Sequence, residues 1–212
     1  MTTNPPSEAP FTLPAGDVER FAPVERAVHW WTAALVGMCA ATAVALSVAP
    51  VASLVGRRAL VRDVHVVSGL LIPLPLIVGI AGRWRAPLRQ ALRDLDRFDR
   101  VDRRWLRSLG RDRYAEPGKF HPGQKLNAAI VAGALVLVYA TGLVLRWFEP
   151  FPIDVRRGAT FVHDWVAFLL AIDLLAHIGK AFADPEALRA MRTGRASRRW
   201  AAVTHPRWRP PG

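Results

Sequence analysis

The sequence predicts an all-α membrane protein, a four-helix transmembrane bundle with both termini in the cytoplasm. Two features of the composition point the same way: 51% of the 212 residues are hydrophobic, yet the formal net charge is +12. Apolar spans joined by basic cytoplasmic loops produce both features at once. Four apolar segments approach the roughly 20 residues that cross a bilayer: 28–50, 64–82, 126–147 and 161–183.

Each of the four segments should be a helix, because lipid offers no hydrogen-bond partner to the backbone and a helix satisfies its own peptide groups. Pro73 and Pro75 predict a kink in the second helix. Small residues let helices approach closely. The candidates for such close approach are Gly69, Gly79, Gly133 and Gly142.

The loop charges predict the orientation. Lys and Arg are dense in 83–125 and 184–212 and sparse in the two other connections. The positive-inside rule therefore places these two segments in the cytoplasm, with four spans between cytoplasmic ends. The sequence is therefore expected to divide into three parts. Residues 1–20 form a disordered tail, which is not a cleaved signal peptide. Residues 21–183 form the transmembrane domain, with 83–125 as its cytoplasmic loop, and residues 184–212 form a basic cytoplasmic tail.

Within the long loop, apolar residues recur at spacings of three and four among arginines. This pattern predicts one amphipathic helix that lies on the cytoplasmic membrane surface and faces lipid headgroups, or that docks on a partner. Its apolar residues are Leu88, Leu92, Leu95, Phe98 or Val101, and Trp105.

Composition also excludes several kinds of site. The basic residues flank apolar runs, so they do not form a nucleic-acid-binding element. Cys39 is the single cysteine, which excludes an internal disulfide, a Cys-rich zinc site and an iron–sulfur cluster within this chain. A C-x-x-C-H motif is missing, so a haem would be held without thioether bonds.

Four histidines lie in or at the ends of the apolar segments, where ionisable groups are costly and suggest function. His163 and His177 are fourteen residues apart, about 21 Å along one helix and within roughly 40° of one face. By depth in the membrane, His29 matches His177 and His65 matches His163. Each histidine alone is equally well explained as a hydrogen-bonded packing residue, but two depth-matched pairs favour two bis-imidazole sites.

A bis-imidazole site between helices fits few metals. Structural zinc normally needs four protein ligands and catalytic zinc three, whereas haem iron needs two axial ligands. Two b-type haems, with His29, His65, His163 and His177 on the irons, are the economical interpretation. A haem-free membrane scaffold and a metal-ion transporter remain alternatives from other classes.

The sequence resembles the di-haem cytochrome b (gamma) subunit of membrane-bound formate dehydrogenase, within the group of prokaryotic cytochrome b561 and hydrogenase cytochrome b. The resemblance extends over about 20–208. It begins with R-F-x-x-x-E-R-x-x-H-W, at Arg20, Phe21, Glu25, Arg26, His29 and Trp30, and continues with Gly123, Gln124, Lys125 and Leu126. The C-terminal motif S-x-x-W-A-x-x-x-H-P-x-W comprises Ser197, Trp200, Ala201, His205, Pro206 and Trp208.

The resemblance implies the same histidine pairing and a location in the bacterial inner membrane. It also implies two partners, a periplasmic iron–sulfur (beta) subunit and a catalytic (alpha) subunit. The chain would accept electrons from the beta subunit and pass them to quinone. The resemblance implies a quinone site at the cytoplasmic end of the third helix, at Gln124. Family members often have Asn where this chain has His121, which could pass a proton or be an exposed loop residue. Asp173, one turn before His177, is expected to make a satisfied polar contact. Other donors remain open: hydrogenase, thiosulfate reductase, or the reductant of a free-standing b561.

Overall fold

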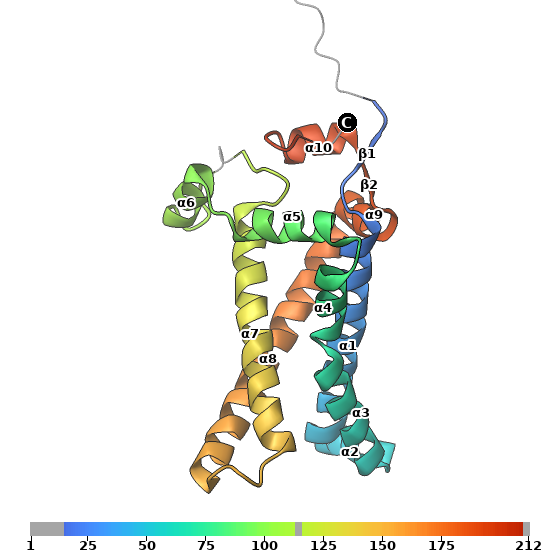
Figure 1. The fold of residues 1–212 in the computed structure, drawn as a ribbon, viewed down its shortest axis with the longest axis vertical. Coiled ribbons are helices and arrows are strands. Elements are labelled where there is room, and N and C mark those ends of the chain that lie inside the picture. The colour runs from blue at the N-terminus through green and yellow to red at the C-terminus, as the bar shows by residue number, and fades with distance from the viewer. Residues whose placement is uncertain (1–14, 113–115, 210–212) are drawn as a thin grey trace, which may run out of the picture.

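Four long helices form the body of the molecule (Figure 1), a computed structural model that describes residues 15–112 and 116–209. They are α1 (Pro23–Ser47), α3 (Arg58–Leu71) with α4 (Leu74–Ala81), α7 (Pro122–Arg146) and α8 (Ile153–Ala183). Each of the four is long and apolar enough to cross a membrane. The prediction of an all-α membrane protein with four spans is therefore confirmed.

The second span is interrupted, as its prolines predict. Pro73 has no N–H to donate, and the helix leaves its regular hydrogen bonding there. The backbone N of Ile72 bonds to the oxygen of Gly69, three residues back, at 3.2 Å. The chain then restarts as α4, so the expected kink is a break between two helices.

The bundle consists of two halves. α1 packs along α3, and α7 packs along α8, while contacts between the two pairs are few. Of the four expected glycines, Gly79 lies at an approach too close for a Cβ, whereas a Cβ on Gly142 would make ordinary van der Waals contact. A Cβ on Gly79 would lie 2.6 Å from Leu88 Cδ2, and one on Gly142 would lie 3.4 Å from the ring of His163. A Cβ on Gly133 would meet nothing within 4 Å.

The amphipathic segment of the long loop is two helices, so the prediction of a single helix is wrong. α5 (Arg85–Asp96) lies across the ends of the spans in Figure 1 and buries Leu88 and Ala91. α6 (Arg100–Arg107) begins anew because the side chain of Asp99 accepts hydrogen bonds from the backbone N of Val101 and Asp102. An aspartate cap of this kind starts a new helix.

Both ends of the described chain meet on one side of the bundle, called here the cap end. β1 (Asp17–Glu19) pairs antiparallel with β2 (Arg195–Ser197), next to α9 (Pro185–Thr193) and α10 (Arg198–Thr204). The short α2 (Ala49–Val55) lies at the opposite end, called the far end (Figure 1). Of the expected tail, 1–14 lies outside the described residues. Strand β1 and the folding of the basic tail into a helix–strand–helix unit were not predicted.

The cap is held together by the residues that carried the resemblance. Arg20 is buried, with 4% of its surface exposed, and its guanidinium lies 4.7 Å from the ring centroid of Trp200 and 5.3 Å from that of Trp208. His205 Nδ1 lies 2.7 Å from the oxygen of Gly118. Burial, and then the charge of Arg20, lower the pKa of His205 to about 4. The ring is therefore neutral near pH 7 and donates Nδ1–H to this carbonyl, which fastens the C-terminal segment to the loop before α7.

Candidate functional site

The structure brings the four membrane histidines together as two pairs. The ring centroids of His29 on α1 and His177 on α8 are 6.2 Å apart, and those of His65 on α3 and His163 on α8 are 6.3 Å apart. These are the combinations expected from depth. Because α8 supplies one histidine to each pair, both pairs bridge the two halves of the bundle, one toward the cap end and one toward the far end.

A threonine determines which nitrogen of His65 carries the proton. The Nδ1 atom lies 2.9 Å from Thr42 Oγ1 and 3.2 Å from the oxygen of Cys39. The Thr42 hydroxyl donates its own hydrogen back to the carbonyl of Met38, at 2.7 Å. Its oxygen is then an acceptor, so Nδ1 carries the proton and Nε2 keeps the lone pair that binds a metal.

His163 has the same arrangement on the other half of the bundle. Its Nδ1 lies 3.1 Å from Thr141 Oγ1, and that hydroxyl donates to the carbonyl of Leu137 at 2.7 Å. The sequence analysis missed Thr42 and Thr141. Their only signal was a hydroxyl inside an apolar run, where it normally bonds to its own helix. Both threonines orient the ring that their helix contacts.

The distance within each pair fits two imidazoles that would hold one metal ion between them. Two metal–nitrogen bonds of about 2 Å each, plus the half-widths of the two rings, account for the distance between the centroids. Among the described residues, no group of three or more His, Cys, Asp and Glu could hold a metal ion. Each pair therefore offers two protein ligands, which suits haem iron and falls short of a usual zinc site.

His121 and Gln124 cap the N-terminus of α7. His121 Nδ1 accepts from the backbone N of Gly123 at 3.1 Å, and Gln124 Oε1 accepts from the backbone N of His121 at 2.8 Å. This is a reciprocal cap. It leaves the Nε2 atoms of both side chains without a hydrogen bond to any described residue. Gln124 Nε2 can therefore donate to a bound molecule, and His121 Nε2, which carries the ring proton while Nδ1 accepts, can donate to one or exchange a proton with it.

His121, at the start of α7, is influenced by a charge on α8. Burial, and then the charge of Lys180, lower the pKa of His121, while Asp102 opposes the shift. Lys180 follows His177 by three residues, one turn of α8. Helix α7 begins at the cap end of the bundle (Figure 1), the end toward which the His29–His177 pair also lies.

A buried ion pair supports this region, and sequence reasoning missed it. Lys125 Nζ lies 2.7 Å from Asp102 Oδ2 and donates to the oxygen of Arg97 at 2.8 Å. Lys125 is 9% exposed and Asp102 is 3% exposed. The pair joins α6 to the first turn of α7. In the sequence, Asp102 is one of several acids in a loop dense with arginine, so nothing distinguished it as buried.

Asp173 does not make the contact that was expected of it. Within the described part of the chain, its half-buried carboxyl has no hydrogen bond and no ion pair, including none with His177 one turn away. The structure therefore assigns no orienting role to Asp173.

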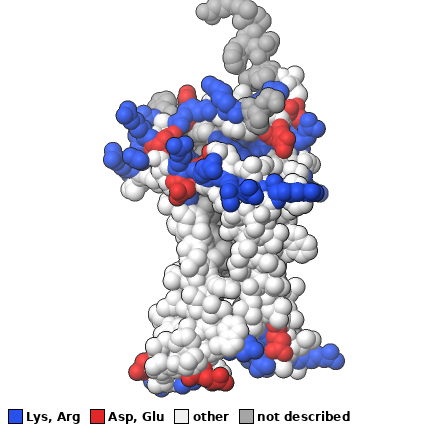
Figure 2. All heavy atoms as spheres, viewed as in Figure 1, with Lys and Arg blue, Asp and Glu red and all other residues white. Residues whose placement is uncertain are grey.

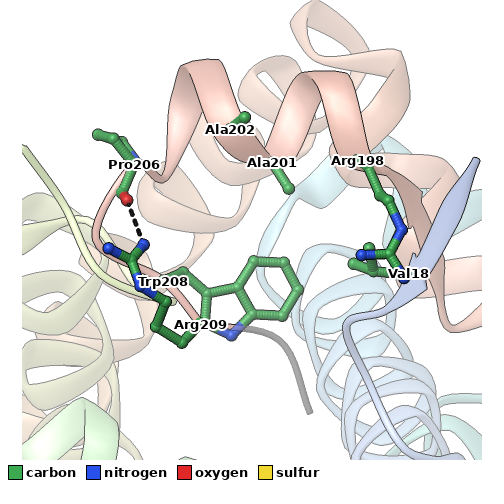
Figure 3. Close-up of a pocket in the computed structure, with 7 residues that line it drawn as sticks. All are labelled: Val18, Arg198, Ala201, Ala202, Pro206, Trp208 and Arg209. Atoms are coloured by element: carbon green, nitrogen blue, oxygen red, sulfur yellow. Dashed lines mark hydrogen bonds between the residues drawn. The ribbon is translucent and has the colours of Figure 1, made fainter. Parts of the chain in front are cut away.

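A pocket of about 190 Å³ lies in the cap, outside the bundle (Figure 3). Val18 of β1, Arg198 of α10, and the C-terminal Trp208 and Arg209 are among its lining residues. None of the four membrane histidines lines it. Its position next to α10 makes it a feature of cap packing, separate from the histidine pairs.

Comparison with known proteins gives a consistent set of matches. Residues 20–194 match the family described as prokaryotic cytochrome b561. The chain is 28% identical over 119 residues to the nitrate-inducible formate dehydrogenase cytochrome b556 subunit of Escherichia coli, which covers 52% of this chain and 55% of that protein. It is 27% identical over 195 residues to the formate dehydrogenase cytochrome b556 subunit of Haemophilus influenzae, covering 86% and 78%. The chain thus spans about half the length of its Escherichia coli relative.

Proposed function

The chain belongs to the prokaryotic cytochrome b561 family, and from this premise we propose that it is the di-haem cytochrome b subunit that anchors a formate dehydrogenase in the membrane. It is a multi-pass protein of the bacterial inner membrane that serves electron transport. The observation that carries the finer proposal is the pair of bis-imidazole arrangements, at 6.2 and 6.3 Å, that link the two halves of the bundle.

In this proposal His29 and His177 hold one haem b, and His65 and His163 hold the other. Bound haem supplies a one-electron redox centre at each of two depths in the membrane. The chain's own contribution is to orient the ligands. Thr42 and Thr141 hold Nδ1–H of two of the rings and keep Nε2 available. Helix α8 sets the separation of the two pairs at about 21 Å.

The distribution of charge supports a cytoplasmic cap end and a periplasmic far end. Figure 2 shows Lys and Arg gathered over the cap end, with an uncharged band over the spans below it. Basic segments remain on the cytoplasmic side during insertion. On this orientation the His65–His163 pair lies toward the periplasm, where a partner iron–sulfur subunit would deliver electrons. The start of α7 then lies at the cytoplasmic side, where quinone would be reduced.

The residues proposed to bind quinone are Gln124 and His121. Quinone oxygens accept hydrogen bonds, and Gln124 Nε2 is a donor with no other partner among the described residues. His121 has a depressed pKa and is therefore largely neutral near pH 7, so its ring can take up and release a proton. The ion pair of Lys125 with Asp102 keeps both residues in place at the first turn of α7.

We expect Gln124→Leu to slow quinone reduction by roughly five- to tenfold, the effect of losing one hydrogen bond of about 1 to 1.5 kcal/mol. The measurement is stopped-flow reoxidation of the chemically reduced purified protein by a soluble quinone. Gln124→Glu is the structural control, because a carboxylate still accepts from the backbone N of His121 but donates nothing. It should be as slow as the leucine variant, whereas Gln90→Leu on exposed α5 should match the wild type. Unchanged kinetics in both Gln124 variants remove this side chain from the site.

The donor is a separate part of the proposal, because the named relatives are subunits of formate dehydrogenases, whereas the family match extends to prokaryotic cytochrome b561 in general. Mild solubilisation of the native membrane, followed by capture of this chain, identifies what it is bound to. Formate-dependent reduction of the captured complex supports the formate dehydrogenase assignment. Hydrogen-dependent or thiosulfate-linked activity would assign the chain to another respiratory complex, and capture of the chain alone would point to a free-standing cytochrome.

A further inference from the structure

Three buried side-chain nitrogens have no hydrogen-bond partner among the described residues, and all three belong to arginines: Arg20 Nη1, Arg26 Nε and Arg156 Nε. A buried guanidinium nitrogen without an acceptor is costly, so each such atom calls for an explanation. Arg20 has one, because its guanidinium stacks on Trp200 and Trp208 within the cap. Arg26 and Arg156 lie on spans that carry the histidines.

Arg26 precedes His29 by three residues on α1, which places it about 4.5 Å nearer the cap end and within roughly 60° of the same helix face. Its Nη1 donates to the backbone oxygen of Arg192 at 2.7 Å. That contact holds the guanidinium against the cap while Nε remains unpartnered. Arg26 therefore lies between the His29–His177 pair and the nearest end of the bundle.

Arg156 has the equivalent position at the far end. It precedes His163 by seven residues on α8, about 10.5 Å along the axis and within roughly 20° of the same face. Its guanidinium carbon lies 5.6 Å from the ring centroid of Phe148, in the loop between α7 and α8. Each histidine pair thus has one arginine toward the nearer membrane surface, with a buried nitrogen lacking an acceptor.

We infer that Arg26 and Arg156 pair with the carboxylates of the two haems, one arginine for each histidine pair, which rests on the proposed function above. A haem b carries two propionate carboxylates at one edge of its ring. Arginine is suited to a carboxylate at a partly buried site, because its planar guanidinium donates two parallel hydrogen bonds and stays charged. The Nε atoms are covered by the protein itself, so a carboxylate between each histidine pair and the surface would be met by Arg26 Nη2 and by the two Nη atoms of Arg156. These atoms make no hydrogen bond to a described residue.

The inference predicts a charge effect that is specific to one haem. A positive guanidinium near a haem favours the reduced form, which carries one more electron. Arg26→Gln should therefore shift the midpoint potential of the His29–His177 haem to more negative values and leave the other haem unchanged. Arg156→Gln should do the reverse. If a glutamine variant loses its haem altogether, the inference is supported in the same way when the lost haem is the one predicted to shift. The lysine variant at the same position must then retain that haem.

The experiment is a redox titration of the purified full-length protein in detergent, with each component assigned by its disappearance in His29→Ala or His65→Ala. The matched controls are Arg157→Gln and Arg192→Gln. Arg157 is the exposed neighbour of Arg156, and Arg192 contacts Arg26 through its backbone oxygen only. Neither control should shift a potential, and the two lysine variants, which keep the positive charge but lose the planar fork, should shift it less than the glutamine variants do.

Two results would overturn the inference. One is unchanged potentials of both haems in Arg26→Gln and Arg156→Gln. The other is a potential shift in Arg157→Gln as large as that in Arg156→Gln, because the effect of Arg156 would then be one of general surface charge. A wild-type protein without haem is a different result, because it would overturn the proposed function itself before any arginine variant is compared.

Discussion

His29→Ala and His177→Ala each remove the same haem, and His65→Ala and His163→Ala each remove the other. This result is expected because, under the proposal, each pair would supply both protein ligands of one haem iron, and either change would leave that iron with a single imidazole. The haem content should fall from two to one per chain in all four variants. Haem extraction with a reduced-minus-oxidised spectrum measures the content and shows which component is lost.

His121→Asn serves as the control for the histidine series. Asparagine is a good helix N-cap, so α7 should still begin at Pro122 and both haems should remain. The pairing would be contradicted if His29→Ala and His65→Ala removed the same component. It would also be contradicted if His29→Ala and His177→Ala removed different ones, because the 6.2 Å contact between their rings would then join ligands of separate irons.

Lys125→Met should be the most destabilising of the changes outside the histidines, by about 3–5 kcal/mol. It leaves the carboxylate of Asp102 buried at 3% exposure without its cation, and it removes the donor to the oxygen of Arg97. The midpoint temperature of heat unfolding in detergent, followed by circular dichroism, should fall accordingly. The first turn of α7 should loosen with it, so quinone reduction should slow as well.

The double variant Lys125→Met with Asp102→Leu should recover most of the lost stability, because two apolar side chains no longer require a charge partner. Arg62→Gln is the exposed control. The Arg62–Asp63 pair spans 3.3 Å, but both side chains are about two thirds exposed, so its loss should cost well under about 1 kcal/mol. If Lys125→Met proved as mild as Arg62→Gln, the pair would not fasten α6 to α7.

The sequence allowed the spans to be predicted because length and hydropathy alone decide whether a segment crosses lipid. Its limits appear at α8, which begins at Ile153 rather than near Phe161. The extra two turns carry Arg156 and Arg157. A prediction based on the length of the apolar run ends the helix at such charges, so it did not include these turns. The break in the amphipathic segment was missed for a related reason, since the apolar spacing continued past Asp99 although its side chain caps a new helix.

The histidine pairs could be predicted because depth is set by position along a span, so residues on different helices can be matched without knowing their contacts. Contacts between side chains that are remote in the sequence could not be predicted in this way. Thr42 and His65 are 23 residues apart, and Lys125 and Asp102 are also 23 apart. No helical period links either pair. The cap depends on Arg20 contacting residues near the C-terminus, which only the folded chain reveals.

The most direct test of the central claim is the number of haems per polypeptide in the purified wild-type protein, measured together with its reduced-minus-oxidised spectrum. We expect two haems of b type per chain, one for each histidine pair. A protein that purifies without haem, and without absorbance that changes on reduction, would contradict the claim, and the four histidines would then be packing residues or ligands of another metal.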